Sequence, residues 1–153
     1  MLRKASASIL ILVLGLVVGL AGVGSTAVEN PAAWEASAAY LTTLPEGFNG
    51  IKGDVLKAKL DAGEQIFLLD VRQPNEFAAG HIEGALNVPV REVPKMLTKL
   101  PQDKNAPVVV ICASAVRSGY ATMALSFKGY TNVKHLAAGY IAGWEKAGYP
   151  VVK

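Results

Sequence analysis

The feature that most constrains the fold is an apolar run that ends in the only cysteine of the chain. Residues 108–111, Val-Val-Val-Ile, are typical of a strand buried on both faces of a sheet, and residues 118–127 have the apolar spacing of a helix. Cys112 therefore lies in a loop that leads from a buried strand into a helix. Strands that alternate with helices in this way predict an α/β fold with a parallel sheet.

The loop after this strand has the chemistry of an anion site. The first turn of a helix offers free backbone N–H groups and the positive end of the helix dipole, and both stabilise a thiolate. Arg117, the fifth residue after Cys112, adds a permanent cation with a fork of donors. The sequence therefore predicts that Cys112 is a nucleophile in an anion cradle. The alternative is an inert buried cysteine, a common state for this residue type.

The first residues have the pattern of a targeting signal. A short basic start and an apolar run over residues 9–20 precede a small-residue motif that ends at Ala27. This pattern predicts a secretory signal peptide over residues 1–27, cleaved after Ala27, and export to the bacterial periplasm. The alternative is an uncleaved membrane anchor with the rest of the protein facing outward, because residues 5–28 are nearly long enough to span a bilayer.

Charge and composition exclude several classes of function. Without Arg3 and Lys4, 13 basic and 12 acidic residues remain with no basic run, so nucleic acid is not an expected partner. One cysteine cannot form an intrachain disulfide, which favours a working thiol in an oxidising compartment. Two histidines and one cysteine lack metal-ligand spacing, so neither a metal nor another cofactor is expected. Contact with a membrane is expected only through an uncleaved N-terminal segment.

The rest of the chain divides into a spacer and one domain. Residues 28–47 form an Ala-rich spacer with a predicted helix over 31–41, and the compact domain is expected over residues 48–153. Strands are predicted over residues 66–70, 85–88, 108–111 and 133–136. Helices are predicted over residues 51–60, 75–79, 92–100, 118–127 and 141–147. The alternation predicts a three-layer α/β/α domain with a mostly parallel central sheet of about five strands.

Ligands of such sheets bind at the carboxyl ends of the strands, where Asp70 and Cys112 both lie. We expect Asp70 either to hold the cysteine loop or, preferably, to cap the turn at residues 73–75. Arg72 and Glu76 lie four residues apart and are expected to pair with each other as part of the frame.

Two histidines are candidate bases for the cysteine. His81 belongs to a glycine-flanked turn and His135 to a predicted strand, so structural roles are favoured for both. Met96, Met123, Phe127 and Trp144 are interpreted as core residues.

Three separated stretches resemble the rhodanese-like sulfurtransferases, and specifically a single-domain exported member. They are Leu69-Asp70-Val71-Arg72 with Glu76-Phe77 and Gly80-His81-Ile82-Glu83-Gly84-Ala85; Cys112 to Ser118; and Gly143-Trp144 with Gly148-Tyr149-Pro150-Val151. The resemblance implies a rhodanese-like domain that moves a sulfane sulfur through a persulfide. The donor would be a small anion of the thiosulfate or persulfide type, and the acceptor a thiol, a cyanide-like nucleophile or a partner protein.

The resemblance also assigns roles to the loop. Cys112 would be the nucleophile, and Arg117 would bind or steer the donor. The backbone N–H groups of the remaining loop residues would hold the persulfide and the donor oxygens; these residues are Ala113, Ser114, Ala115, Val116 and Ser118. Asp70, Arg72, Glu76 and His81 would support the loop from a second layer.

Two positions depart from the family pattern. Ala115 stands where glycine is common, and a positive φ there costs about 1–2 kcal/mol, so we expect a slightly reshaped loop. Ala138-Gly139 replaces a pair of glycines, which we expect to narrow the adjoining turn. Both positions leave the preference for a donor open.

Two other functions fit parts of the pattern. A cysteine phosphatase uses a similar cradle but has five residues between cysteine and arginine, whereas this chain has four. A non-catalytic persulfide carrier or interaction module with the same fold is the main alternative, and the spacer and the export signal favour it.

Overall fold

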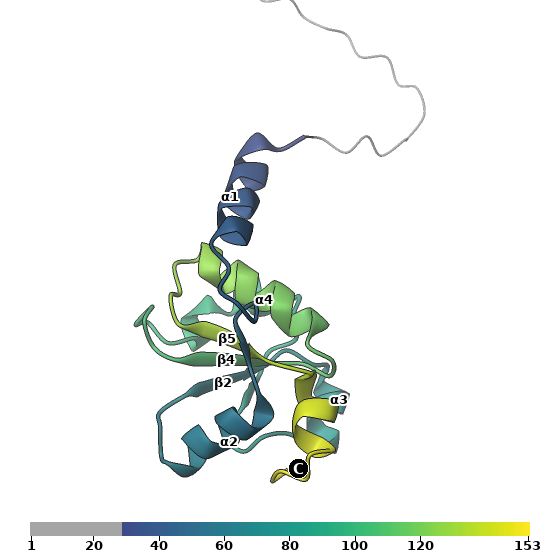
Figure 1. Ribbon diagram of the computed structural model, residues 1–153. Helices are drawn as coiled ribbons and strands as arrows, with labels where there is room; N and C mark the ends of the chain where they lie inside the picture. Colours follow the sequence, from purple (N-terminus) through teal and green to yellow (C-terminus); the bar gives the residue numbers. More distant parts are fainter. Residues whose placement is uncertain (1–28) are drawn as a thin grey trace, which may run out of the picture. The chain divides into compact units, whose positions relative to one another are not determined.

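A computed structural model of the chain describes residues 29–153 (Figure 1). Five strands form one sheet in the order β1-β5-β4-β2-β3, and every neighbouring pair is parallel. They are β1 (Gly50–Ile51), β2 (Phe67–Asp70), β3 (Leu86–Asn87), β4 (Val108–Ile111) and β5 (Val133–Leu136). This confirms the predicted parallel sheet and places β4, the strand that leads into Cys112, at its centre.

Four α-helices and three shorter helical turns accompany the sheet. The helices are α1 (Pro31–Thr42), α2 (Gly53–Asp61), α3 (Pro74–Ala79) and α4 (Val116–Phe127). The short turns are of 3₁₀ type at Val93–Lys95 (η1) and Leu97–Lys99 (η2), and of the wider π type at Ile141–Glu145 (η3).

Alternate residues of β4 enter two separate cores. Val108 and Val110 pack with residues of α4 and the 3₁₀ turns, whereas Val109 and Ile111 pack with α2 and the π turn. Figure 1 shows α4 on one face of the sheet and α2 on the other. The side-chain period of two in a strand therefore builds the predicted three-layer α/β/α domain, with all four β4 residues buried.

Helix α4 packs through one stripe of its surface. Its buried residues are Ser118, Ala121, Thr122 and Leu125, at the spacing of a helix face turned toward a sheet. The helix begins at Val116, two residues earlier than predicted, because Ala115 takes a left-handed conformation at the N-cap. The loop between Cys112 and the helix is consequently short.

Three local predictions differ from the structure. The predicted start of a helix at residue 51 is wrong, since Gly50–Ile51 pairs with β5 as an edge strand before α2 begins. The predicted helix over 92–100 is two 3₁₀ turns, because Met96 between them has φ −111° and ψ 21°, outside the helical region. Phe127 is 47% exposed, so its assignment to the core is wrong.

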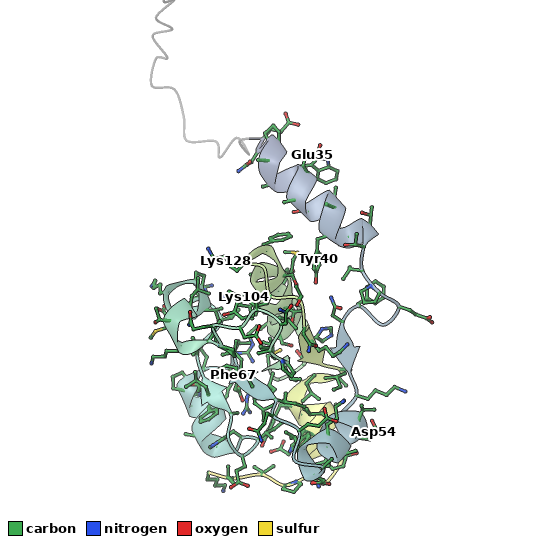
Figure 2. All side chains as sticks on the ribbon, turned by 90° about the vertical axis from the view of Figure 1, so that its left-hand side faces the viewer. Glu35, Tyr40, Asp54, Phe67, Lys104 and Lys128 are labelled. Carbon is green, nitrogen blue, oxygen red and sulfur yellow. The ribbon has the colours of Figure 1, made fainter. Side chains whose placement is uncertain are left out.

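Helix α1 confirms the predicted helix of the spacer, and none of its residues is buried. Tyr40, labelled in Figure 2, lies near its end, and the Tyr40 ring meets that of Phe127 edge-on with centroids 5.6 Å apart. Within residues 29–153 no helix is both long and apolar enough to cross a membrane. The predicted signal peptide lies outside the described residues.

Candidate active site

The thiol of Cys112 faces the first turn of α4. Its Sγ accepts the backbone N–H of Ser118 at 3.3 Å and lies 3.3 Å from the Ser118 hydroxyl oxygen. The Cys112 residue is fully buried. The sulfur is thus enclosed at the positive end of a helix, where an anionic sulfur gains a hydrogen bond and a favourable dipole.

The loop around the sulfur contains a left-handed alanine. Ala115 has φ +72°, as the glycine usual at this position would allow. Its carbonyl accepts the N–H of Gly119 at 2.9 Å and the hydroxyl of Ser118 at 3.0 Å. This conformation costs alanine about 1–2 kcal/mol, so the backbone of the loop is strained beside the thiol.

The turn after β5 holds the other side of the loop. The N–H of Tyr140 donates to the Cys112 carbonyl at 2.7 Å, and that of Ile141 donates to Ala113 at 3.1 Å. Ala138 and Gly139 both have positive φ, and a Cβ on Gly139 would lie 2.5 Å from the Ala113 oxygen. Only glycine lets the turn approach the loop this closely.

Arg117 and Glu76 form a two-pronged ion pair between α4 and α3. Arg117 Nη1 and Nη2 donate to the two carboxylate oxygens of Glu76 at 2.7 and 2.8 Å. This guanidinium lowers the pKa of Glu76 from 4.5 to about 2. Glu76 raises the pKa of Arg117, and the Cys112 thiolate contributes in the same direction. The guanidinium therefore stands beside both the carboxylate and the sulfur.

Arg72 pairs with Asp70, so the predicted pair of Arg72 with Glu76 is wrong. The Asp70 carboxylate accepts the Arg72 backbone N–H at 2.9 Å, its Nε at 2.9 and 3.0 Å, and its Nη2 at 2.7 Å. Both side chains are almost fully buried. The physical reason is strand geometry: residues two apart share one side of an extended chain, whereas Glu76 sits on a helix that turns toward α4.

The Asp70–Arg72 ion pair supports the site through two further contacts of Arg72. Arg72 Nη2 also donates to the Gly80 carbonyl at 2.8 Å, and its guanidinium lies 3.9 Å from the centre of the Tyr140 ring. Asp70 does not cap the turn at residues 73–75, because Gln73 caps α3 reciprocally with Glu76. Asp70 therefore acts through Arg72, which joins α3 to the turn that supports the loop.

Neither histidine has a recorded hydrogen bond to Cys112 in the described part of the chain. His81 stacks on Phe77 with ring centres 3.7 Å apart, and its Nδ1 lies 3.1 Å from the Phe77 carbonyl oxygen. This supports the predicted structural role of His81. His135, on β5, is half-buried, and burial lowers its pKa and favours the neutral ring.

Two features of the site have no local signal in the sequence. Glu76 and Arg117 are 41 residues apart, and no spacing rule for helices or strands joins them. The support from Tyr140 comes from the turn between β5 and η3, which is far from the Cys112 loop along the chain. The family resemblance includes Glu76 and Arg117, but only the folded chain assigns their partners.

Comparison with known proteins adds a family to this geometry. The sequence model of the rhodanese-like domain matches residues 53–147. A sulfurtransferase of Allochromatium vinosum is 36% identical over 104 residues, which cover 68% of this chain and 94% of that protein. The thiosulfate sulfurtransferase PspE of Escherichia coli is 39% identical over 67 residues, covering 44% of this chain and 64% of that one.

The solved structures agree with the sequence matches. A rhodanese-related protein of Thermoplasma volcanium superposes with a TM-score of 0.60 at 33% identity, covering 69% of this chain and 98% of that structure. The chain spans about half the length of two other curated relatives. The matched region contains the strand, loop and helix around Cys112.

Proposed function

The chain belongs to the rhodanese-like domain family, and from this premise we propose that it is a sulfurtransferase that works through a persulfide on Cys112. The observation that carries the proposal is the position of the Cys112 sulfur, which accepts a backbone N–H from the first turn of α4. A nucleophilic thiolate needs such a setting. The sulfurtransferase names of the relatives support the general activity.

The proposed reaction has two displacement steps without net redox change. The Cys112 thiolate attacks the outer sulfur of a thiosulfate- or persulfide-type donor, and the donor S–S bond breaks. The leaving sulfite or thiolate departs with the bonding electron pair. A thiol or cyanide-like acceptor then attacks the outer sulfur of the Cys112 persulfide, forms a new bond to it and releases the Cys112 thiolate.

The loop would stabilise the charged species of both steps. The Ser118 N–H already donates to the sulfur, and we expect the neighbouring loop N–H groups to hold the added sulfur atom. Arg117 stands beside the sulfur as a fixed positive charge. The proposed steps use no general base.

We also propose that the activity belongs to an exported protein. The basic start, the apolar run and the small residues before Val28 support secretion to the periplasm or an outward-facing anchor. The expected partners are a small sulfur donor and a thiol, a cyanide-like nucleophile or a partner protein as acceptor.

The experiment is a transfer assay on the full chain with thiosulfate or an organic persulfide as donor and cyanide or a thiol as acceptor. Wild type should turn over, whereas Cys112→Ala should lose transfer by more than about a thousandfold because the nucleophile is gone. Ser126→Ala, a hydroxyl loss at the far end of α4, is the matched control and should keep wild-type turnover. Equal turnover by wild type and Cys112→Ala would reject the proposal.

The complete burial of Cys112 favours one second candidate, a persulfide carrier that exchanges sulfur only with a partner protein. Such a carrier would accept one sulfur but would not turn over with small acceptors. Turnover with purified components therefore supports the enzyme, and turnover that requires a cell-envelope extract supports the carrier.

A further inference from the structure

The structure surrounds the Cys112 loop with two different cavities, and their charges differ. The cavity on the Ala113 side has a volume of about 200 Å³ and is lined by Arg72, Glu76 and Glu145 among other residues. The lining thus carries the carboxylates of Glu76 and Glu145 and the guanidinium of Arg72, which is already bound to Asp70. This side of the loop disfavours an anion with two negative charges.

The positive charge of Arg117, on the Cys112 loop, is also neutralised by a carboxylate. Arg117 is the single charged side chain among residues 113–118. Both of its terminal nitrogens donate to the Glu76 carboxylate, which is itself held by the Gln73 N–H at 2.9 Å. A dianionic donor would therefore compete with a carboxylate that is fixed in place and fits the same fork.

The cavity on the Val116 side is larger and carries no formal charge. Its volume is about 360 Å³, within the range of small-molecule sites, and its lining includes Phe48, Val116, Tyr120 and Met123. Three of these side chains are unusually exposed for their type: Phe48 by 71%, Val116 by 63% and Tyr120 by 67%. His135 also lines it and is kept neutral by burial, so the wall offers apolar contact.

Two buried polar atoms in this lining have no partner in the described residues. They are Thr122 Oγ1, on a residue that is only 1% exposed, and His135 Nδ1. A buried polar atom without a hydrogen bond is costly, and a ligand or a water that supplies one removes that cost. Both atoms belong to residues that line the cavity but are themselves buried, so recognition there rests on the apolar walls.

We propose that the sulfur donor is a small organic compound that carries its sulfane sulfur on an apolar body, and that this body lies in the cavity between Val116 and Phe48. Glu76 selects against dianionic donors by occupying the fork of Arg117. The inference rests on the proposed function and narrows its donor. With an alkyl hydropersulfide, the Cys112 thiolate takes the outer sulfur, the donor S–S bond breaks, and an alkyl thiolate leaves with the electron pair.

The test compares thiosulfate with alkanethiosulfonates of increasing chain length, using the full wild-type chain and kcat/KM for persulfide formation. Alkanethiosulfonates carry one negative charge fewer and a variable apolar group. We expect them to be preferred, with kcat/KM rising about twofold per added methylene, as partial burial of each group predicts. A preference for thiosulfate, or no dependence on chain length, would overturn the inference.

Glu76→Gln tests the selection directly. Glutamine keeps a side-chain oxygen that can accept the Gln73 N–H at the start of α3. It removes the negative charge that holds the two terminal nitrogens of Arg117. The KM for thiosulfate should fall about tenfold with a smaller change in kcat, since a charge-assisted hydrogen-bonding site becomes free. The KM for hexanethiosulfonate should change by less than about threefold. Glu92→Gln, which removes an exposed carboxylate paired with Lys95, is the matched control and should change neither value.

Tyr120→Ala tests the cavity independently, because this exposed side chain can be removed without disturbing the core. The KM for the longest alkyl donor should rise about fivefold, consistent with lost apolar contact, and that for thiosulfate should stay constant. Trp34→Ala removes an equally exposed aromatic outside the cavity and serves as the control. Equal effects of Tyr120→Ala on both donors would contradict the assignment.

The outcomes distinguish a failure of the proposed sulfurtransferase function from a failure of the donor inference. If no donor adds a sulfur atom to Cys112, as read by intact mass, the proposed function fails. If thiosulfate adds sulfur fastest and Glu76→Gln leaves its KM unchanged, the sulfurtransferase stands and the donor inference fails.

Discussion

Two arginines beside the Cys112 loop are each held by a carboxylate, and this arrangement decides how charge is distributed around the thiol. Arg72 is bound to Asp70 in the interior, and Arg117 is bound to Glu76 at the half-buried edge. The buried pair fixes the frame, since removing either partner leaves an uncompensated charge. The outer pair leaves its charges partly in water and so can exchange partners.

The Glu76–Arg117 pair makes stability depend on pH in the acid range. The folded chain holds the pKa of Glu76 at about 2, below its ordinary 4.5, because the carboxylate accepts two bonds from Arg117. The stabilisation is therefore present above about pH 4.5 and is lost as the pH falls toward 2. After allowance for solvent exposure, about 1–2 kcal/mol should disappear over this interval.

Urea unfolding between pH 6 and 2.5 measures this loss. Glu76→Gln should remove the corresponding part of the pH dependence, whereas Glu92→Gln should retain it. Identical pH profiles for wild type and Glu76→Gln would show that the ion pair does not contribute.

The strained alanine of the loop gives a second prediction. Ala115→Gly should raise the free energy of unfolding by about 0.5–1 kcal/mol, because relief of the left-handed strain exceeds the extra backbone entropy of glycine. Ala113→Gly removes the same methyl group from a loop residue without positive φ and should destabilise the protein. Thermal or urea unfolding of the three proteins measures both effects. A less stable Ala115→Gly would contradict the strain argument.

At this scale, residues with a local signal could be predicted and their distant partners could not. Cys112 and Arg117 follow from a strand, a loop and a helix that are contiguous in sequence. The expected Arg72–Glu76 pair is wrong because spacing of four implies contact only within one helix, and Arg72 precedes α3. The partner of Glu76 depends on how α3 and α4 meet.

Among the elements, short apolar runs predicted β2, β4 and β5, and apolar spacing of a helix predicted α4. The two-residue strand β1 is too short to carry a pattern, and it exists because β5 offers it a partner. The 3₁₀ turns at residues 93–99 show the converse case, in which apolar spacing suggested one helix but the backbone leaves the helical region at Met96.

The turn between β5 and η3 is the element that fixes the loop from outside, and it can be tested. Gly139→Ala should lower sulfur transfer at least tenfold, because the new Cβ would overlap the Ala113 carbonyl and displace the loop. Gly129→Ala is a matched control: Gly129 also has positive φ, but nothing lies within 4 Å of its Cβ position. Gly129→Ala should lose about 1 kcal/mol of stability from backbone strain, and Gly139→Ala should lose more because its new Cβ also overlaps backbone atoms.

Transfer kinetics and unfolding should be measured on the same samples. The expected result is that sulfur transfer, measured where both variants are folded, falls in Gly139→Ala and stays near the wild-type value in Gly129→Ala. Comparable activity in Gly139→Ala and Gly129→Ala would show that the turn does not position the loop.

At the scale of the whole molecule, a parallel sheet places the ends of β2 and β4 at one edge, where Asp70 is in register with Ile111, the residue before Cys112. The class of fold and the edge that carries the site could therefore be predicted from the alternation of strands and helices and from the position of charged residues. The cavity beside Val116 could not, because it depends on how the segment before β1 lies against α4. The assignment of residues 28–47 as a spacer and 48–153 as the domain stays a prediction.

The N-terminal prediction also belongs to this scale. Expression of the full chain in a Gram-negative host should give a periplasmic product whose mass corresponds to a start at Val28, because the small residues before it form a cleavage motif. A membrane-bound product of full mass would instead establish the anchor. Lys4→Glu together with Arg3→Glu should slow export, and Lys153→Glu is the control for charge.

The most direct measurement is intact mass followed by peptide mapping of the full chain after exposure to a sulfane-sulfur donor. We predict a gain of one sulfur atom per chain, located on the peptide that contains Cys112, and its loss when a thiol or cyanide is added. A chain that gains no sulfur with thiosulfate or with any organic donor, or gains it equally in Cys112→Ala, would contradict the account.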